Sequence, residues 1–416
     1  MRIALLNDDA LPTARGGAAV IVDKLQQGYR ERGHETLLIT THQDASLGNI
    51  VRSQGMISLL SSYPLSKQHR HCLGDPAMRK MLSQVFEEWK PDAVHAHNVH
   101  HHITYESLEI AARHTKKILL TAHDTLLVSY GRVRGLQYEE AAMKGVPLQM
   151  HWWDHIGEAG RKYWPLRNRT TRRILAKSGT GVVAISSAVA SFLRMNRITV
   201  AATIPNGIEH WDVPSQEAIL DFKGKYGISG PAVLFVGRVR EDKGIRALLA
   251  AADRVLDAIP SAQFIVNGEM EHLLPHLAFA TERVRKAVVP TGWISREQTR
   301  LSYFACDVVT TPSLYLDNFP TVNLEAMAAG KPVVGTCFGG TPEVVADGTT
   351  GIIVNPRGTM EFSNALIALL QNPDQAKKMG EVGRKRVQKD FSVERQVDAY
   401  LKLFEAHSKI QDARYK

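Results

Sequence analysis

The sequence feature that most constrains the fold is an alternation of short apolar runs with amphipathic helical patterns, which occurs on both sides of a linker with two prolines and a glycine. The linker, residues 205–214, shows neither a helical nor a strand period. Strands that alternate with helices pair in parallel and are covered by helices on both faces. The alternation therefore predicts an α/β protein with two Rossmann-like, doubly wound parallel-sheet domains that face each other across a cleft.

The length of the chain agrees with this division, because 416 residues suggest two domains of roughly 200 residues each. We expect residues 1–207 to form the first domain, residues 208–390 the second, and residues 391–416 a C-terminal helix that packs back toward the first. The first apolar run is too short for a signal peptide, and no run reaches the roughly 18 apolar residues that span a membrane. We therefore expect a cytoplasmic protein.

The positive charge of the chain is concentrated in one region. The formal net charge is +9, and residues 161–208 contain nine Lys and Arg residues but no Asp or Glu. Such a block attracts nucleic acid, anionic lipid headgroups or an anionic substrate, and a solvated helix face accounts for it equally well. Nucleic acid is disfavoured as a partner because the basic residues do not form a known nucleic-acid motif.

Five histidines crowd into residues 95–102. No matching set of cysteines or carboxylates accompanies them, and side chains that alternate along a strand cannot all converge on one ion. We therefore expect no metal site, and we expect solvated loop histidines of which one or two line a cleft. The three cysteines are widely spaced and odd in number, which predicts reduced thiols.

Two features of the first domain lie where ligands bind in open α/β sheets. Gly16 and Gly17 precede the first amphipathic helix, where they either let the backbone approach a ligand or make a tight turn. His123 and Asp124 follow the apolar run 118–122, at the carboxyl end of a predicted strand. The aromatic and basic stretch 126–169 interrupts the alternation and predicts either a substrate cover or a helical cap.

The second domain carries a loop that suits a diphosphate. Residues 237–244 connect a predicted strand to a helix and contain Arg238 and Lys243. A planar guanidinium and a point charge together neutralise the charge that develops on a departing nucleotide without a metal ion. The alternative is a pair of exposed loop cations.

A second stretch of this domain, residues 312–334, combines carboxylates with a helix start. Its helix is opened by Pro320 and closed by Gly330, and Asp317 and Glu325 flank the point where it begins. A helix N-terminus attracts phosphate groups, whereas carboxylates accept protons from sugar or ribose hydroxyls. The stretch therefore predicts a site for a phosphorylated sugar or nucleotide.

Two further motifs are Gly339-Gly-Thr-Pro-Glu343 and Pro205-Asn-Gly207. Together with the two stretches of the second domain described above, they resemble the retaining glycosyltransferases of family 4, which have the GT-B fold. The resemblance covers nearly the whole chain and is most specific in the second domain. It implies a retaining, metal-independent enzyme that moves a sugar from a UDP- or GDP-linked donor to a glycan or lipid-linked acceptor in cell-surface polysaccharide synthesis. It also implies that the first domain binds the acceptor, that the second binds the nucleotide sugar, and that no cofactor is needed.

The same resemblance implies roles for individual residues. Arg238 and Lys243 would bind the donor diphosphate, and Glu325 the ribose hydroxyls. Asp317 would face the transferred sugar, and His123 would meet its hydroxyls near the reacting carbon. The implied catalytic residues are His123, Asp317, Arg238 and Lys243, and the implied donor-binding residues are Gly16, Gly17, Arg238, Lys243, Asp317, Phe319, Thr321, Val322 and Glu325.

The sequence departs from the family pattern at two positions. The family usually has glutamate in place of Asp317 and glycine near Pro320, so the identity of the sugar and the role of Asp317 stay open. The competing functions are a nucleotide-sugar epimerase or hydrolase with the same fold, and a subunit that binds a nucleotide sugar without catalysis. The basic block and the aromatic stretch lead us to expect contact with an anionic membrane surface on the inner face of the cell membrane.

Overall fold

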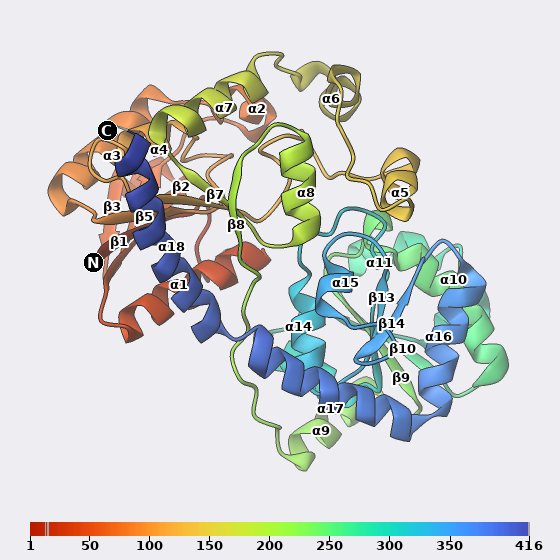
Figure 1. The fold of residues 1–416 in the computed structure, drawn as a ribbon. Helices are drawn as coiled ribbons and strands as arrows, with labels where there is room; N and C mark the ends of the chain where they lie inside the picture. Colours follow the sequence, from red (N-terminus) through yellow and green to blue (C-terminus); the bar gives the residue numbers. More distant parts are fainter. Residues whose placement is uncertain (13, 15, 415–416) are drawn as a thin grey trace. The chain divides into compact units, whose positions relative to one another are not determined.

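The computed structural model describes residues 1–12, 14 and 16–414 and divides into two compact units, each described here by itself (Figure 1). The first unit comprises Met1–Val133, Pro147–Gly207 and the chain from Val393 to the end of the described residues. The second comprises Arg134–Val146 and Ile208–Ser392. Tyr415 and Lys416, the last two residues of the predicted C-terminal helical segment, lie outside the described residues. Each unit contains one extended sheet of mainly parallel strands, so the predicted fold class is confirmed.

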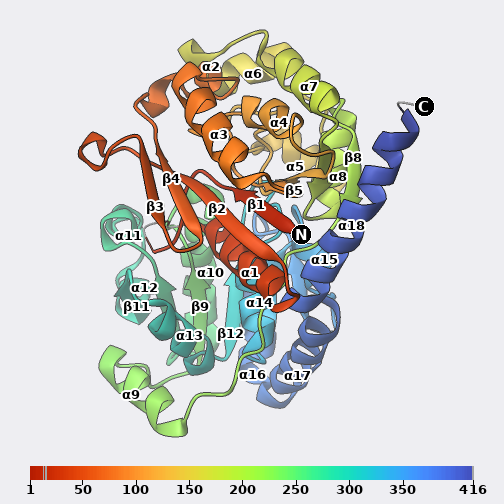
Figure 2. The ribbon, with the colours of Figure 1, turned by 90° about the vertical axis from the view of Figure 1, so that its left-hand side faces the viewer.

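The first unit is built on an eight-stranded sheet with the order β3-β4-β2-β1-β5-β6-β7-β8. Neighbouring strands are parallel except at the β3–β4 edge, where the two strands run antiparallel (Figure 2). The central strand β1 pairs with β2 on one side and with β5 on the other. The strands are β1 (Arg2–Leu6), β2 (Glu35–His42), β3 (Ile50–Ser53), β4 (Met56–Leu60), β5 (Ala93–Ala96), β6 (Ile118–Ala122), β7 (Gly181–Ala184) and β8 (Val200–Thr203).

Helices cover this sheet, and two of them pack closely against each other. Helix α18 lies along α1 (Figure 1), and Val397 and Tyr400 of α18 share a buried cluster with Leu25 of α1. A Cβ at Gly28 would lie 2.5 Å from Val397 Cγ2, so the close approach requires glycine there. The helices are α1 (Gly17–Glu31), η1 (Ala45–Leu47), η2 (Leu65–Lys67), α2 (Gln68–His71), α3 (Pro76–Trp89), α4 (Glu106–Ala111), α6 (Trp152–Ala159), η3 (Gly160–Lys162), α7 (Arg167–Ser178), α8 (Ser187–Met195) and α18 (Val393–Arg414).

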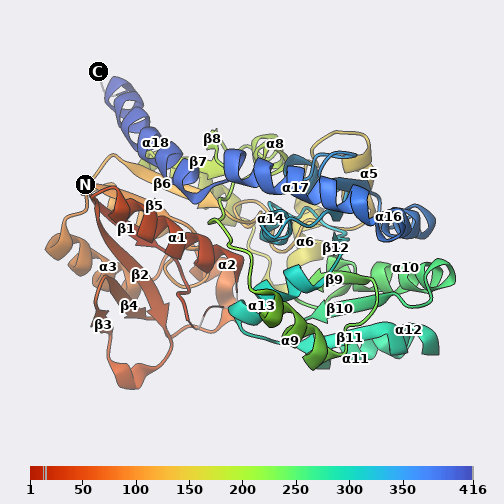
Figure 3. The same ribbon diagram turned by 90° about the horizontal axis from the view of Figure 1, so that it is seen from below.

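The second unit is built on a six-stranded sheet with the order β11-β10-β9-β12-β13-β14, in which all neighbours are parallel (Figure 3). This is the doubly wound order, in which the chain leaves the central strand β9 in one direction and returns to its other side with β12. The strands are β9 (Ala232–Val236), β10 (Gln263–Asn267), β11 (Val288–Gly292), β12 (Val308–Thr311), β13 (Val333–Thr336) and β14 (Gly351–Val354).

The helices of the second unit enclose this sheet. Phe235 of β9, Phe264 of β10 and Phe362 of α16 belong to one buried core, which α10 joins through Leu248. None of the helices in the described part of the chain is long and apolar enough to cross a membrane. The helices are α5 (Leu136–Met143), α9 (Gln216–Tyr226), η4 (Glu241–Lys243), α10 (Ile245–Ala258), α11 (Met270–Leu277), α12 (Glu282–Ala287), α13 (Arg296–Ala305), α14 (Thr321–Ala328), α15 (Thr341–Val344), α16 (Thr359–Gln371) and α17 (Pro373–Asp390).

The predicted domain boundaries differ from the structure at Arg134–Val146. The prediction places this segment in the first domain, residues 1–207, but it belongs to the second unit. The buried carboxylate of Glu139 accepts two hydrogen bonds from Arg357, at 2.8 Å from Nη2 and 3.0 Å from Nε. The hydroxyl of Tyr138 accepts a hydrogen bond from the backbone N–H of Gly339 at 3.0 Å. These partners lie about 200 positions away in the sequence, so no local pattern reveals the contact.

We expect Glu139→Gln to loosen this segment, because a neutral amide cannot form the paired, charge-assisted hydrogen bonds with Arg357. The expected loss is about 1 kcal/mol, since Arg357 is half exposed and regains water. Limited proteolysis should cut within residues 134–146 several times faster than in the wild type. Glu140→Gln, which changes an exposed neighbour, is the matched control, and equal cleavage of both variants would contradict the assignment.

Candidate functional site

In the second unit, two loops meet at the carboxyl edge of the sheet, where β9 and β12 are neighbours. The chain leaves these two strands in opposite directions, and such a switch point is where doubly wound sheets bind ligands. The loop after β9 carries Arg238 and Lys243, and the loop after β12 carries Asp317. The fold therefore brings the second domain's predicted residues to one edge of one sheet.

Lys243 and Asp317 form an ion pair, with Lys243 Nζ 2.7 Å from Asp317 Oδ2. Burial by itself would lower the pKa of Lys243, but the charge of Asp317 and the contact with Tyr315 outweigh burial and raise it. Burial would likewise raise the pKa of Asp317, but Lys243 and a hydrogen bond from Ser313 Oγ at 2.9 Å lower it. Both groups are therefore charged, and the ammonium is fixed at the loop junction.

Two glycines allow these loops to come this close. Gly244 has a φ of +82°, and a Cβ there would lie 1.9 Å from the carbonyl oxygen of Pro312. Gly339 has a φ of +66°, and a Cβ there would lie 2.2 Å from the carbonyl oxygen of Asp317. The N–H of Gly340 donates to this same carbonyl at 2.7 Å. Any other residue at Gly244 or Gly339 would force the loops apart.

Glu325 lies one turn inside α14, which begins at Thr321 directly after Pro320. The N–H groups of Thr321 and Val322 have no acceptor within the helix, as at any helix start, so they are available to an anion. Tyr303 donates its hydroxyl to Glu325 Oε2 at 2.5 Å. Burial raises the pKa of Glu325, and this hydrogen bond opposes the rise.

Arg238 and Phe319, which were also predicted for this site, differ in their surroundings. The side chain of Arg238 is exposed on the loop after β9. Phe319 is 4% exposed, and its ring packs against Phe391 at 5.7 Å between centroids. A ligand could therefore meet Phe319 only through its backbone.

The structure adds polar residues that the sequence analysis missed. Asn323 of α14 is fully buried, and its Oδ1 accepts from Thr311 Oγ1 at 2.9 Å. Its Nδ2 lies 3.3 Å from Thr341 Oγ1, so one side chain links β12, α14 and α15. An asparagine beside the apolar residues of α14 was the available signal. Ser313, Tyr315 and Tyr303 had no such signal because they resemble ordinary loop and helix residues.

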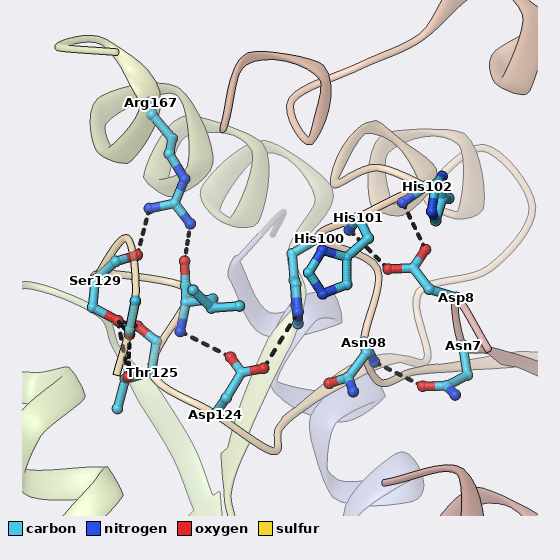
Figure 4. Close-up of polar contacts among 12 residues, drawn as sticks. Asn7, Asp8, Asn98, His100, His101, His102, Asp124, Thr125, Ser129 and Arg167 are labelled. Atoms are coloured by element: carbon cyan, nitrogen blue, oxygen red, sulfur yellow. Dashed lines mark hydrogen bonds and ion pairs between the residues drawn. The ribbon is translucent and has the colours of Figure 1, made fainter. Parts of the chain in front are cut away.

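In the first unit, polar side chains gather at the corresponding switch point, between β1 and β5. The Asp8 carboxylate, which follows β1, accepts backbone N–H groups of His101, His102 and Ile103 at 2.7–2.9 Å (Figure 4). Burial nevertheless raises the pKa of Asp8 to about 7. This carboxylate fixes the loop that follows β5.

The prediction that the neighbouring histidines are solvated is wrong. His95, His97, His100 and His102 are all buried, and only His101 is partly exposed. β5 is an internal strand, and Asp8 holds the following loop against the sheet, so these four rings have little access to water. His95 contacts the hydroxyls of Tyr29 and Thr121 at 3.0 and 2.9 Å, which accounts for its ring nitrogens.

His123, the predicted catalytic residue of this unit, lies at the end of β6 and is half-buried. Its Nε2 is 2.9 Å from His97 Nδ1, so one ring must donate to the other. Burial lowers the pKa of His123 to about 4, although Asp124 opposes this shift. His123 is therefore neutral at pH 7 and suits hydrogen bonding to a hydroxyl.

The remaining features of this unit hold the site in place. Asp124 Oδ2 lies 3.3 Å from His100 Nε2, and the buried Arg167 donates to the carbonyls of Leu126 and Ser129 (Figure 4).

Gly16 and Gly17 are exposed at the start of α1, and no atom would lie within 4 Å of a Cβ at Gly16. The described residues contain no group of three or more His, Cys, Asp or Glu side chains arranged to hold a metal ion.

Two family models match consecutive parts of the chain. The model described as Glycosyltransferase Family 4 matches residues 15–211, and the model described as Glycosyl transferases group 1 matches residues 221–386. Together they cover both units and meet near the predicted linker.

Comparisons with individual proteins agree with these matches. An uncharacterized glycosyltransferase of Methanocaldococcus jannaschii is 28% identical over 86% of each chain. Two other curated relatives are matched over only 45% and 40% of their own lengths. Among solved structures, sucrose-phosphate synthase from Thermosynechococcus elongatus aligns with a TM-score of 0.72 and 21% identity over 97% of this chain and 99% of that one. Anabaena HepE in complex with UDP-glucose aligns with a TM-score of 0.68 and 17% identity over 98% of this chain and all of that one.

Proposed function

Since the chain belongs to the family 4 glycosyltransferases with the GT-B fold, we propose that it transfers a sugar, with retention of configuration and without a metal ion, from a nucleoside diphosphate donor to a glycan or lipid-linked acceptor. The observation that carries this proposal is the charged Lys243–Asp317 pair beside the start of α14 in the second unit. It provides a cation for the phosphates and a carboxylate for a sugar hydroxyl at the sheet's ligand-binding edge.

In this proposal the donor's parts are divided among the second unit's residues. Lys243 and the exposed Arg238 neutralise the diphosphate, and the N–H groups of Thr321 and Val322 donate to its oxygens. Glu325 accepts protons from the ribose hydroxyls, and Asp317 from those of the sugar. UDP-glucose bound to the structurally similar HepE supports a nucleotide-sugar donor here.

The first unit supplies the acceptor side. Gly16 and Gly17 allow the start of α1 to approach a bound group, and neutral His123 donates or accepts a hydrogen bond at a sugar hydroxyl. The bond between the anomeric carbon and the phosphate oxygen breaks, and the acceptor oxygen takes its place on the same face. The departing phosphate accepts the proton of the acceptor hydroxyl. This route suits Asp317, whose Oδ2 is held by Lys243 and Ser313 and is a poor nucleophile.

We further propose that the enzyme acts in cell-surface polysaccharide synthesis at an anionic membrane surface. The acid-free basic stretch 161–208 supports this proposal, together with the exposed side chains of Trp152 and Trp153. Cations beside aromatic rings suit the headgroup region of a membrane.

Product analysis tests the transferase activity. The purified chain is incubated with UDP-glucose, UDP-N-acetylglucosamine or GDP-mannose, alone and with a panel of saccharides and a total lipid extract. We expect slow nucleotide release from one donor alone and a new α-linked product when an acceptor is present. Rapid release of free sugar without acceptor would indicate a hydrolase, and an isomerised donor would indicate an epimerase. Either result would contradict the transferase proposal.

A further inference from the structure

An open pocket of about 400 Å³ lies in the first unit between α6, α7 and the end of α8, and neither Asp8 nor the histidines of residues 95–102 line it. Three arginines, Arg169, Arg172 and Arg197, line it, and its described lining contains no Asp or Glu. A second pocket of about 460 Å³ shares Arg172 and Arg197 with the first and continues along the start of β7 and β8. These two arginines therefore line both pockets.

The three arginines of this pocket have no carboxylate partner in the described part of the chain, and two carboxylates of α6, Asp154 and Glu158, bond instead to the backbone N–H groups of His151 and Tyr130 in the pocket wall. Residues 161–208, which contain all three arginines, include no acidic residue, and no ion pair joins the three to a described carboxylate. Burial lowers the pKa of Arg172, and the nearby charge of Arg197 lowers it further. Like charges held together at a partly buried position favour an anion between them.

The backbone of Arg197 is strained. Its φ is +66°, at the position after the end of α8 where glycine is usual. The N–H of Arg197 donates to the carbonyl of Arg194 at 3.1 Å, and that of Ile198 donates to the carbonyl of Leu193 at 2.9 Å, so the helix ends in a tight turn. A residue with a Cβ pays a penalty of about 1 kcal/mol there. The arginine side chain thus occupies the pocket wall at the expense of backbone stability.

A buried histidine without a hydrogen-bond partner on one ring nitrogen also lies in the wall of the pocket. Arg167 Nη1 donates to Asn168 Oδ1 at 2.9 Å, which fixes the orientation of the amide. Asn168 Nδ2 therefore donates to His155 Nε2, at 3.3 Å, and the proton of the neutral ring lies on Nδ1. His155 is 8% exposed and lines the pocket, and its Nδ1 has no hydrogen-bond partner in the described structure. A buried N–H without a partner is costly unless a ligand accepts its proton.

The rim of the pocket is apolar and its wall is rigid. Trp152 and Met195 line it and are 63% and 41% exposed. Asn196 holds the wall together, because its Nδ2 donates to the carbonyl of Leu148 at 3.0 Å and its Oδ1 accepts from Met150 N at 2.8 Å. Arginines beside exposed apolar side chains suit a ligand with a charged head and an apolar part.

We propose that this pocket binds a phosphate group carried on an apolar chain, with Arg169, Arg172, Arg197 and His155 Nδ1 as the donors and Trp152 and Met195 against the chain. The site rests on the proposed contact with an anionic membrane surface and gives it a defined pocket, but it is distinct from the donor residues of the second unit and needs no nucleotide sugar. Its test uses neither donor nor catalysis, so it can fail while the proposed function stands.

The full-length chain is titrated with a short-chain phosphatidylglycerol below its micelle concentration, with short-chain phosphatidylcholine, and with inorganic phosphate, and tryptophan fluorescence is followed. We expect saturable binding of the phosphatidylglycerol, at least tenfold weaker binding of inorganic phosphate, and weak binding of phosphatidylcholine, whose trimethylammonium group meets the arginines. Inorganic phosphate that binds as tightly as the lipid would overturn the apolar part of the site.

Arg197→Gly is the decisive variant, because it removes a proposed ligand and relieves the strained backbone. We expect its melting temperature to equal or exceed that of the wild type, while phosphatidylglycerol binding weakens tenfold or more. Arg173→Gln is the matched control, since it removes an exposed charge of α7 that does not line the pocket. Unchanged binding by Arg197→Gly, or an equal loss in Arg173→Gln, would overturn the proposal.

Discussion

The Lys243→Ala variant is expected to lose about 10²–10³-fold in kcat/KM for donor turnover, which corresponds to about 2.7–4 kcal/mol of transition-state stabilisation. The ammonium is fixed by Asp317 at 2.7 Å, and the pKa of Lys243 is raised, so the cation is present throughout the physiological pH range. It therefore needs no rearrangement as negative charge grows on the leaving diphosphate. The measurement is steady-state kinetics with the donor that the product analysis identifies.

The interpretation of this variant depends on separating lost catalysis from damage to the fold, because it leaves the Asp317 carboxylate buried without its partner. Binding of UDP and of uridine is therefore compared in the same samples. If Lys243 acts on the diphosphate, the variant weakens UDP binding much more than uridine binding. Equal weakening of both ligands would show that the loop has collapsed. Lys385→Ala, which removes an exposed cation of α17, is expected to match the wild type.

Acidification is expected to destabilise the first unit steeply below pH 6.5. Burial lowers the pKa of His95 and His100 to about 3 from the ordinary 6.5, and burial also lowers that of His97. The unfolded chain therefore binds protons at a pH at which these folded rings cannot. Above pH 6.5 these rings are neutral in both the folded and the unfolded chain, so their burial adds no pH-dependent cost. As the pH falls from 6.5 toward the folded pKa values, the free energy of unfolding decreases by about 1.4 kcal/mol per histidine per pH unit.

Two carboxylates of the first unit, Asp8 and Asp124, oppose this trend, because burial raises the pKa of both. The pKa of Asp8 is raised by burial from 3.8 to about 7, so between these values the folded state holds a proton that the unfolded chain releases. Protonation of Asp8 thus stabilises the folded state as the pH falls, and it offsets the loss of stability caused by roughly one histidine. The net result expected for His95, His97 and His100 is a loss of several kcal/mol between pH 6.5 and 4.5.

Urea unfolding followed at several pH values measures this effect. His97→Asn removes one titrating ring and should reduce the slope of stability against pH by about 1.4 kcal/mol per unit. His272→Gln, which changes an exposed histidine of α11 in the second unit, should leave the slope unchanged. A stability of the first unit that stays constant between pH 6.5 and 5 would contradict the buried, neutral state of these rings.

The strands and the ligand edge of each sheet could be predicted because their signals are local. Short apolar runs mark β1, β6 and β9, and polar residues directly after a strand, such as His123 and Arg238, fall at the carboxyl edge by geometry alone. Lys243 and Asp317 are 74 positions apart, yet each follows a central strand, so their meeting at 2.7 Å is a consequence of strand order. The alternation predicts parallel, doubly wound sheets, and the order of the strands within each sheet comes from the structure.

The parts that could not be predicted depend on contacts between distant residues. Glu139 reads as an ordinary surface residue of a short helix until Arg357, 218 positions away, is placed beside it. The sequence does not show whether His95 and His97 are exposed, because histidine is a residue of intermediate burial, and the pairing of β5 with β1 and β6 buries them. The strained Arg197 likewise has no sequence signal, because glycine rather than arginine marks most left-handed helix ends.

The central claim is that the second unit binds a nucleotide sugar through Lys243 and Glu325. Calorimetric titration of the purified chain with UDP-glucose, UDP-N-acetylglucosamine and GDP-mannose, in the presence of a metal chelator, tests it most directly. We predict saturable, metal-independent binding of one of these donors, lost in Lys243→Ala, weakened in Glu325→Gln and retained in Lys385→Ala. Binding that is absent for every donor, or that is the same in all three variants as in the wild type, would contradict the account.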